Sequence, residues 1–238
     1  LLDEIVKKDV SRALKEDLQS GDVTGKLIEL KQRSVAKVIT RQSMTLAGKD
    51  WFNESILQLD SNALIEWIFN DGDDVKPNQT LCTIKANSRA LLAGERTALN
   101  FLQLLSGIAS QTRKYTEQIQ SNTKILDTRK TLPNLRAAQK YAVTCGGGVN
   151  HRFGLYDQFL IKENHILACG TIKHAVTKAK LQQPNLKVEV EVEDLNQLQQ
   201  ALACPVDIIM LDNFSIPLIK QAIKIRDYQK IKLEASGN

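Results

Sequence analysis

The sequence predicts an α/β protein with an N-terminal α+β sandwich and a C-terminal parallel α/β sheet or barrel. In the first hundred residues, segments with helical spacing stand beside short alternating strands, which is typical of a sandwich. The apolar-rich segment 91–106 then predicts a long helix that bridges two domains. Beyond it, strand-like runs alternate with helical segments, the pattern of a parallel sheet. We expect one domain over residues 1–99 and a second over residues 100–238.

The N-terminal elements are predicted by their periodicity. Apolar residues at helical spacing indicate a helix over residues 5–18, and residues 34–40 alternate as a strand does. In that strand Val35, Lys37 and Ile39 share one face. The remaining elements expected here are a helix over 51–59, strands over 63–69 and 81–86, and a turn at 70–74.

The second half of the chain contains six strand-like runs and four main helical segments. The runs cover residues 124–128, 149–153, 159–162, 187–192, 207–211 and 231–235. The helical segments cover residues 134–143, 171–181, 195–203 and 216–224. In a parallel sheet of this kind, ligands bind at the carboxyl ends of the strands.

The composition excludes several classes of protein. No run of eighteen apolar residues is present, so no membrane-spanning segment is expected. The four cysteines are far apart and form no C-x-x-C pair, which favours reduced thiols in the cytoplasm over disulfides or a zinc site. The formal net charge of +5 is compatible with nucleic-acid binding. However, Lys and Arg are dispersed and aromatic residues make up only 5%, so we favour a pocket for a small anion.

Basic side chains follow three successive strand-like runs. The first run leads into Arg129 and Lys130. The second carries His151 and Arg152, and the third ends at Lys162. Gathered at one edge of a sheet, these groups repel one another unless an anion compensates them, and arginine forks fit phosphates and carboxylates. The set predicts an anion site, although any one of these residues alone is better explained as a solvated loop charge.

Acidic side chains form a second pattern. Residues 187–192 alternate valine with glutamate, so a barrel strand would pack its valines under the helices and point Glu189 and Glu191 inward. Buried carboxylates need cations, a metal or substrate hydroxyls. With Asp212, which follows another apolar run, they could hold a hydrated Mg²⁺. The alternative is an edge strand with its glutamates in water.

A glycine run, Gly146-Gly147-Gly148, separates a helical segment from a strand-like run. Its backbone N–H groups could bind phosphate. The run fits neither G-x-G-x-x-G nor the Walker pattern, and a helix stop with a tight turn explains it equally well. We interpret it as a turn. No G-x-S-x-G motif indicates a hydrolase.

Four motifs follow one another in the middle of the chain: Asp127-Thr128-Arg129-Lys130-Thr131, Lys140-Tyr141-Ala142-Val143, Gly146-Gly147-Gly148-Val149-Asn150-His151-Arg152 and Leu160-Ile161-Lys162-Glu163-Asn164-His165. Their order and spacing resemble those of quinolinate phosphoribosyltransferases. Residues 94–100, 188–192, 210–213 and 233–237 also resemble segments of that family. The resemblance therefore covers nearly the whole chain.

The resemblance implies a fold and a set of site residues. The fold is an N-terminal α/β sandwich plus an open α/β barrel of the type II phosphoribosyltransferase kind. The protein would be a homodimer with shared active sites, in which each subunit lends Arg96 to its partner. Glu191 and Asp212 would contact ribose hydroxyls and Mg²⁺, and Lys130 would join them in catalysis. The residues implied to bind the quinolinate carboxylates and sugar phosphates are Arg129, Lys130, His151, Arg152 and Lys162.

The implied reaction belongs to de novo NAD biosynthesis. Phosphoribosyl passes from phosphoribosyl pyrophosphate to quinolinate, with loss of pyrophosphate and CO₂, to give nicotinate mononucleotide. The implied setting is the cytoplasm, with no nucleic-acid or membrane partner. Two alternatives are a related enzyme for another pyridine acid, such as nicotinate, and a non-catalytic anion-binding homologue. The dense set of cations favours a dianionic acceptor.

The sequence departs from the family pattern at two places. Leu132 and Asn134 stand where the family usually has Thr and Gly, in the loop expected to close over substrate. The family also continues past the position of Asn238 through a strand, a Gly-rich phosphate-binding turn and a tail that returns to the first domain. The expectation is therefore a barrel without its C-terminal closing elements.

Overall fold

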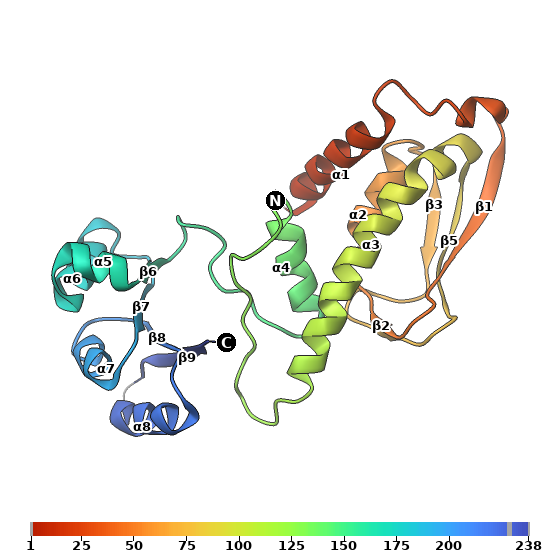
Figure 1. Cartoon of the computed structure of the whole chain (residues 1–238). Coiled ribbons are helices and arrows are strands. Elements are labelled where there is room, and N and C mark those ends of the chain that lie inside the picture. The colour runs from red at the N-terminus through yellow and green to blue at the C-terminus, as the bar shows by residue number, and fades with distance from the viewer. Residues whose placement is uncertain (1, 228–229, 238) are drawn as a thin grey trace. The chain divides into compact units, whose positions relative to one another are not determined.

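A computed structural model of the chain describes residues 2–227 and 230–237. It consists of two compact units, Leu1–His151 and Arg152–Asn238, each with its own helices and strands (Figure 1). The sequence-based boundary between residues 99 and 100 stays a prediction.

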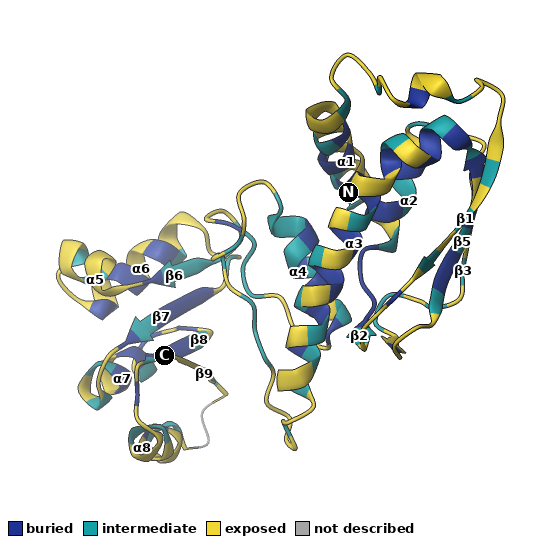
Figure 2. Cartoon of the chain, turned by 45° about the vertical axis from the view of Figure 1, so that its right-hand side comes forward, coloured by how far each residue is buried: buried dark blue, intermediate teal, exposed yellow. Residues whose placement is uncertain are grey.

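The first unit contains a three-stranded antiparallel sheet of order β1-β5-β3, formed by β1 (Arg33–Ile39), β5 (Thr80–Asn87) and β3 (Leu64–Trp67). Exposure alternates along β1, with Val35, Lys37 and Ile39 on the outer face (Figure 2), as its period of two predicts. Two short strands, β2 (Met44–Thr45) and β4 (Asp74–Val75), pair separately. A single 3-10 turn, η1 (Gly25–Leu27), precedes β1.

Four helices complete the first unit: α1 (Leu2–Leu18), α2 (Lys49–Leu57), α3 (Ser88–Thr116) and α4 (Arg136–Cys145). One core cluster joins α1, α2, α3 and α4 around the fully buried Trp51 and Leu105. A second joins α2 and α3 to the sheet through Phe52 and Leu102, among others. The helices and strands that the sequence predicts over residues 1–99 are therefore confirmed, and they bury two apolar clusters together with α3 and α4.

Helix α3 is longer than the predicted segment 91–106. It begins at Ser88, directly after the N-cap residue Asn87. The Asn87 side chain accepts hydrogen bonds from the Arg89 and Ala90 N–H groups at 3.0 and 3.3 Å, which satisfies two donors at the start of the helix. It continues past Gly107 because Ala109 and Thr112 extend the buried stripe. The sequence prediction stopped where the run of large apolar residues stops.

The glycine run follows the end of α4. A Cβ atom at Gly146 would overlap the Ala109 carbonyl oxygen of α3, and Gly147 has a φ of +86°, a conformation that favours glycine. The Gly146 and Gly147 N–H groups return to the Ala142 and Thr144 carbonyls. The run is thus a helix stop packed closely against α3, as interpreted from the sequence.

The second unit is a four-stranded parallel sheet of order β6-β7-β8-β9, with its strands linked by helices. The strands are β6 (Phe159–Ile161), β7 (Val188–Val192), β8 (Ile208–Asp212) and β9 (Lys232–Ser236). The helices are α5 (Glu163–Cys169), α6 (Ile172–Gln182), α7 (Leu195–Leu202) and α8 (Ile216–Arg226). The expected parallel α/β arrangement is confirmed.

The two faces of this sheet differ in chemistry. Val188, Val190 and Val192 are fully buried in a cluster that includes residues of α6, α7 and α8. The glutamates between them belong to the opposite face. The sequence therefore predicted correctly that the valine face of β7 packs under the helices.

Two predicted strands are wrong. Residues 124–128 and 149–153 contribute only one isolated parallel bridge, between Leu126 and Val149. The ladder does not extend because the next N–H group, that of His151, donates to the Asp127 side chain at 2.8 Å instead of to a strand. Helix α5 was not predicted, since it has no buried residue and hence no apolar stripe.

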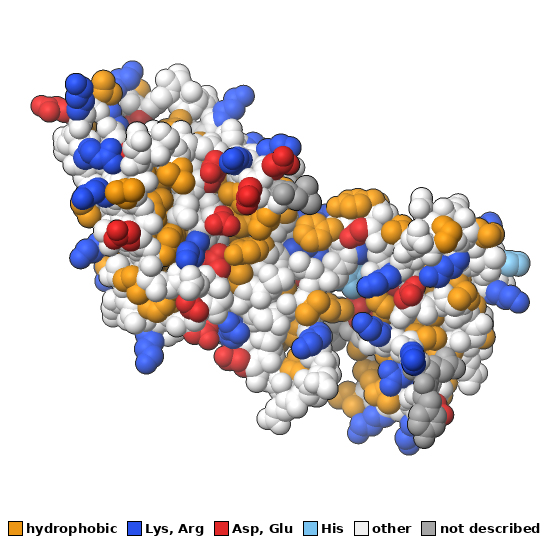
Figure 3. Space-filling model, turned by 180° about the vertical axis from the view of Figure 1, so that it is seen from behind, with side chains coloured by type: hydrophobic (Ala, Val, Ile, Leu, Met, Phe, Trp, Pro, Cys, Tyr) orange, Lys and Arg blue, Asp and Glu red, His pale blue; other side chains and the backbone are white. Residues whose placement is uncertain are grey.

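The surface of the described residues carries both signs of charge. On the face drawn in Figure 3, Lys and Arg side chains are scattered and interspersed with Asp and Glu. None of the helices among the described residues is both long enough and apolar enough to cross a bilayer.

Candidate active site

Three of the predicted site residues lie at the carboxyl ends of neighbouring strands in the second unit. Lys162 follows β6, Glu191 is the fourth residue of β7, and Asp212 ends β8. Leu160 pairs with Glu189, and Glu191 pairs with Met210. Because paired residues of parallel strands point to the same face, Lys162, Glu191 and Asp212 share the face opposite the valines. The sheet thus brings onto one face a lysine from the predicted set of cations and two carboxylates from the predicted acidic set.

Lys162 and Glu191 form an ion pair. The Lys162 Nζ atom donates to Glu191 Oε2 at 2.5 Å, with side-chain exposures of 45% and 14%. The mostly buried carboxylate thus has the cation that its burial requires. Lys162 also precedes α5, where its backbone N–H donates to His165 Nδ1 at 3.0 Å. This cap fixes the point at which the lysine leaves the sheet.

Asp212 ends the strand at a sharp change of backbone direction. The next residue, Asn213, has a φ of +55°, a left-handed conformation that Asn tolerates better than most residues. Its side-chain amide donates to Asp212 Oδ2 at 2.9 Å, and its N–H donates to the Ser236 carbonyl of β9 at 2.8 Å. The Asp212 carboxylate is therefore held at the strand end, on the same face as Glu191.

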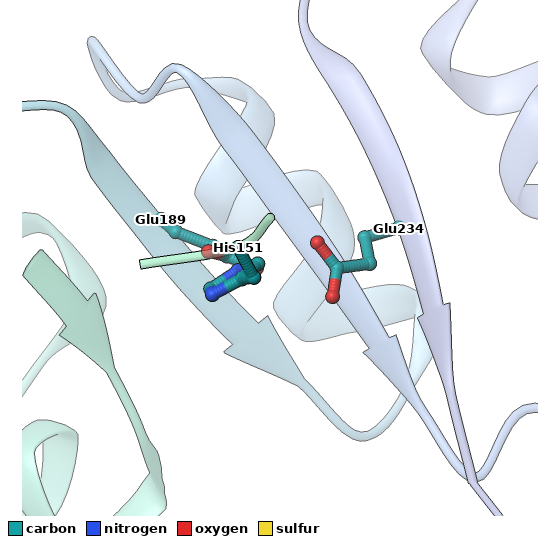
Figure 4. Close-up of side chains that lie close together, drawn as sticks. All are labelled: His151, Glu189 and Glu234. Atoms are coloured by element: carbon teal, nitrogen blue, oxygen red, sulfur yellow. The ribbon is translucent and has the colours of Figure 1, made fainter. Parts of the chain in front are cut away.

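Two further carboxylates occupy this face. Glu189 is fully buried and accepts a hydrogen bond from Gln158 Nε2 at 2.6 Å. Glu234, which pairs with Met210, projects from β9 on the same side of the sheet (Figure 4; His151, also drawn there, belongs to the other unit). Sequence reasoning did not select Glu234 as a site residue. The alternation of the polar residues Lys232, Glu234 and Ser236 with apolar ones could have indicated that Glu234 lies on the polar face.

Arg152 begins the second unit and is partly buried. The two residues after it are fixed by one carboxylate, because the Phe153 and Gly154 N–H groups donate to Asp157 at 2.7 and 3.0 Å. Arg152 therefore emerges from an ordered turn and not from a β-strand.

In the first unit, Arg129 and Lys130 lie in the loop between α3 and α4. Arg129 is partly buried and Lys130 is exposed. The Lys130 N–H donates to Thr128 Oγ1 at 3.0 Å, which makes a tight local turn. The loop is attached to α4, since Gln139 Oε1 accepts from the Leu132 N–H at 2.7 Å. These contacts present the two cations on an anchored loop.

The loop also explains one departure from the family pattern. Asn134 has a φ of +66°, a conformation that glycine adopts freely and that Asn adopts more readily than other residues with side chains. Asn134 therefore adopts a backbone conformation that also suits glycine, the residue that the family usually has at this position. Leu132 is half exposed, and nothing in the structure explains why it replaces threonine.

His151 is held by its own backbone. Its N–H donates to Asp127 Oδ1 at 2.8 Å, and its carbonyl accepts from Lys140 Nζ at 3.0 Å. Asp127 begins the motif that carries Arg129 and Lys130. The segments that carry Arg129, Lys130 and His151 are therefore linked within the first unit.

Arg96 lies on the exposed side of α3. It lines a cavity of 320 Å³ together with Glu16 and Asp17 of α1. Within the first unit, Arg96 is not among the residues linked by Asp127. The sequence predicted that the cations gather at one edge of a sheet. Because these cations belong to both units, that arrangement stays a prediction.

Comparison with known proteins identifies the family. The model described as the quinolinate phosphoribosyl transferase N-terminal domain matches residues 22–106. The model described as the C-terminal domain of the same enzyme matches residues 108–238. The chain belongs to the quinolinate phosphoribosyltransferase family. The two matches meet inside α3, the helix that was predicted to bridge two domains.

Curated relatives and solved structures of this family agree. A probable nicotinate-nucleotide pyrophosphorylase [carboxylating] from Bacillus subtilis is 39% identical over 234 residues, covering 98% of this chain and 81% of that protein. The Mycobacterium leprae nicotinate-nucleotide pyrophosphorylase [carboxylating] is 39% identical over 238 residues, covering 96% and 83%. The structure of the Francisella tularensis nicotinate-nucleotide pyrophosphorylase is 50% identical, with a TM-score of 0.95 over 99% of this chain and 84% of that one.

Proposed function

We propose that this chain transfers phosphoribosyl from phosphoribosyl pyrophosphate to quinolinate and decarboxylates the product to nicotinate mononucleotide. The observation that carries the proposal is the polar sheet face of the second unit. There, Lys162, Glu191 and Asp212 lie at or next to the carboxyl ends of three neighbouring strands, in a chain that belongs to this family. Each matches a position that the family resemblance assigned to substrate.

The proposed residues suit the charges of the reaction. As the bond from ribose C1′ to the pyrophosphate oxygen breaks, positive charge develops on the sugar ring and negative charge on the leaving group. Fixed carboxylates such as Glu191 and Asp212 stabilise the first, and basic side chains stabilise the second. The pyridine nitrogen then bonds to C1′. The bond from the adjacent ring carbon to its carboxylate then breaks as CO₂ leaves, and the electron pair stays on that carbon beside the pyridinium charge. A proton from solvent then bonds to this carbon, which gives nicotinate mononucleotide.

The basic loop residues fit the two anionic substrates. Arg129, Lys130, His151 and Arg152 would bind the quinolinate carboxylates and sugar phosphates. Arg129 and Arg152 are the best suited of these for bidentate binding of a planar carboxylate, because a guanidinium presents parallel donors. Lys130, which is exposed, would contribute a mobile charge for a phosphate and act in catalysis.

Mg²⁺ is part of the proposal. Glu191 and Asp212 are carboxylates on the same face of adjacent strands, and Mg²⁺ prefers one or two carboxylates together with substrate phosphates and water. The donor set therefore fits, with Glu191 and Asp212 holding the ion partly through water or substrate. When bound, Mg²⁺ would neutralise the developing charge of pyrophosphate.

The proposal extends to assembly and location. The exposed position of Arg96 on α3 suits a residue lent to the partner subunit of a homodimer with shared active sites. The four cysteines are free thiols in the structure, which suits the reducing cytoplasm. Neither nucleic acid nor a membrane has a place in the proposed reaction.

A direct test is product formation by the purified protein. With quinolinate, phosphoribosyl pyrophosphate and Mg²⁺, we expect nicotinate mononucleotide in a chromatographic assay, and we expect phthalate, a dicarboxylate mimic, to inhibit competitively. Chelation of Mg²⁺ should remove the activity. Product formation from nicotinate but not from quinolinate would move the assignment to another pyridine acid. Tight quinolinate binding without any product would support a non-catalytic homologue.

A further inference from the structure

Helix α4 contains a lysine in an unusual place. Lys140 has no exposed side-chain surface, although lysine is among the residues least often buried. Its ammonium group forms an ion pair with Asp127, whose side chain is 6% exposed. A buried charge pair of this kind is costly to desolvate and contributes little net stability. Its presence therefore calls for a role other than stabilising the fold.

The ion pair holds His151 through both of its backbone polar groups. Asp127 Oδ1 accepts the N–H of His151 at 2.8 Å, and Lys140 Nζ donates to the carbonyl of His151 at 3.0 Å. Both backbone polar groups of His151 are thus bonded to the two members of one ion pair. Hydrogen bonds to ionised groups are shorter and stronger than neutral ones, so the pair restrains the His151 backbone more firmly than neutral partners would.

A third side chain completes the network. The amide of Asn150, with its nitrogen turned toward these oxygens, donates to Asp127 Oδ2 at 2.6 Å and to the Lys140 carbonyl at 3.0 Å. Both carboxylate oxygens of Asp127 are therefore used by the segment 150–151 or by Lys140. A carboxylate with this many donors has one orientation.

Backbone pairing alone would not fix this segment. The only β-bridge that residues 124–128 and 149–153 form is Leu126 with Val149, supported by bonds of 3.2 Å from the Asp127 N–H and 2.9 Å from the Val149 N–H. Beyond this bridge, side-chain hydrogen bonds connect the two segments. Asp127, Lys140 and Asn150 thus join the motif that carries Arg129 and Lys130 to the segment that carries His151.

We propose that Asp127 and Lys140 are positioning residues, which set the backbone of His151 and hence the placement of its imidazole against the anionic substrate. The inference deepens the proposed function and rests on it for the role of His151. Neither residue touches substrate in this account. Removal of the pair should therefore displace the imidazole and weaken catalysis while the fold persists.

The test uses a double variant, Asp127→Asn with Lys140→Met, which removes both charges together and leaves no lone buried charge. The chain has three histidines, so the imidazole signals can be assigned by NMR with His165→Gln and His174→Gln. We expect the His151 signal to shift in the double variant, while the signals of His165 and His174 stay in place. We also expect kcat/KM for quinolinate to fall about 10- to 100-fold, which is the typical loss when a site residue is misplaced.

Tyr141→Phe is the matched control. Tyr141 is the next residue of α4, and its hydroxyl donates to Asp71 at 2.7 Å, outside the Asp127–Lys140 ion pair. This variant should lower the melting temperature while the His151 signal and kcat/KM stay unchanged. A His151 signal that moves equally in both variants would show a general loosening of α4 and overturn the proposal.

Two further comparisons cover the cases in which the double variant does not fold or the protein has no transferase activity. If the double variant does not fold, Asn150→Ala, at an exposed position, should move the His151 signal in the same direction by a smaller amount; no movement would overturn the proposal. If the unaltered protein lacks transferase activity, the NMR result still decides whether Asp127 and Lys140 position His151, and only the proposed function fails. A folded double variant with unchanged His151 signal and unchanged kcat/KM contradicts the inference.

Discussion

At the residue scale, single carboxylates fix the loops of the first unit. Asp60 is one example. Its side chain accepts the Asn87 N–H at 2.7 Å and the Asn62 N–H at 3.0 Å, and Arg33 lies 3.5 Å away. The hydrogen bond from Asn87 is the main cause of a lowered Asp60 pKa. Because Asn87 caps α3, Asp60 supports the start of that helix.

The lowered pKa predicts a pH-dependent loss of stability in Asp60→Asn. The folded-state pKa lies below the unfolded value of roughly 4, so the ionised carboxylate stabilises the fold above that pH. The contribution disappears as the pH falls through the folded-state pKa. We expect the free energy of unfolding to drop by about 1 kcal/mol at pH 7, and the deficit to shrink toward zero near the acid limit of folding. Urea denaturation at several pH values measures this difference.

Glu29→Gln, at an exposed position, is the control for Asp60→Asn. A deficit for Asp60→Asn that stays constant between neutral and acid pH would mean that its charge does not contribute.

Single residues were predicted correctly where the strand periodicity and the position of the residue in the strand point to the same place. Lys162, Glu191 and Asp212 were predicted as strand-end residues, and the sheet places them on one face. The burial of Lys140, which the sequence marked only as part of a family motif, was not predicted, because a lysine in a helix is normally exposed. Its burial comes from the loop segments that cover α4 and form the Asp127 pair, which no local pattern reveals.

At the element scale, the parallel sheet of the second unit was the most predictable feature. The valine–glutamate alternation of β7 fixed which face packs under helices, and the valines are fully buried. The segments around Leu126 and Val149 were mistaken for strands because they are rich in β-prone residues. Their polar neighbours instead form side-chain hydrogen bonds, which end the ladder after one bridge. Tertiary contacts of this kind override local propensity.

The position of Glu191 on β7 leads to a prediction about catalysis. Glu191→Gln keeps the size of the side chain but removes the charge that faces Lys162 and, in the proposed reaction, the ribosyl centre. We expect kcat to fall by about 100-fold or more, with a change of only a few degrees in melting temperature. Steady-state kinetics and thermal unfolding on the same preparation measure both quantities.

Glu193→Gln provides the comparison, since Glu193 is exposed immediately after β7. It should leave kcat unchanged. Wild-type kcat in Glu191→Gln would remove this residue from the mechanism.

At the scale of the whole molecule, the fold class and the family were both predictable from the sequence. The change from sandwich-like to alternating periodicity marked two differently built parts, and two family models match on either side of residue 107. Sequence alone gives no relation between a residue and a second subunit. The role of Arg96 therefore remains a proposal, to be tested on the assembly.

Shared active sites predict complementation between two inactive variants. Arg96→Ala and Glu191→Gln should each be nearly inactive alone. In a two-fold dimer with sites built from both subunits, a mixed dimer has one intact site, so random exchange restores about a quarter of the sites. Activity is measured after denaturation and refolding of an equal mixture. Failure to recover activity, with mixed dimers demonstrated by differently tagged subunits, would argue against sharing.

The central claim is tested most directly by CO₂ release from quinolinate radiolabelled in the carboxyl group next to the ring nitrogen. With phosphoribosyl pyrophosphate and Mg²⁺, we predict labelled CO₂ in equal amount to nicotinate mononucleotide, and none when phosphoribosyl pyrophosphate is omitted. A folded protein that binds both substrates but releases no labelled CO₂, or that releases it without forming the nucleotide, would contradict the account.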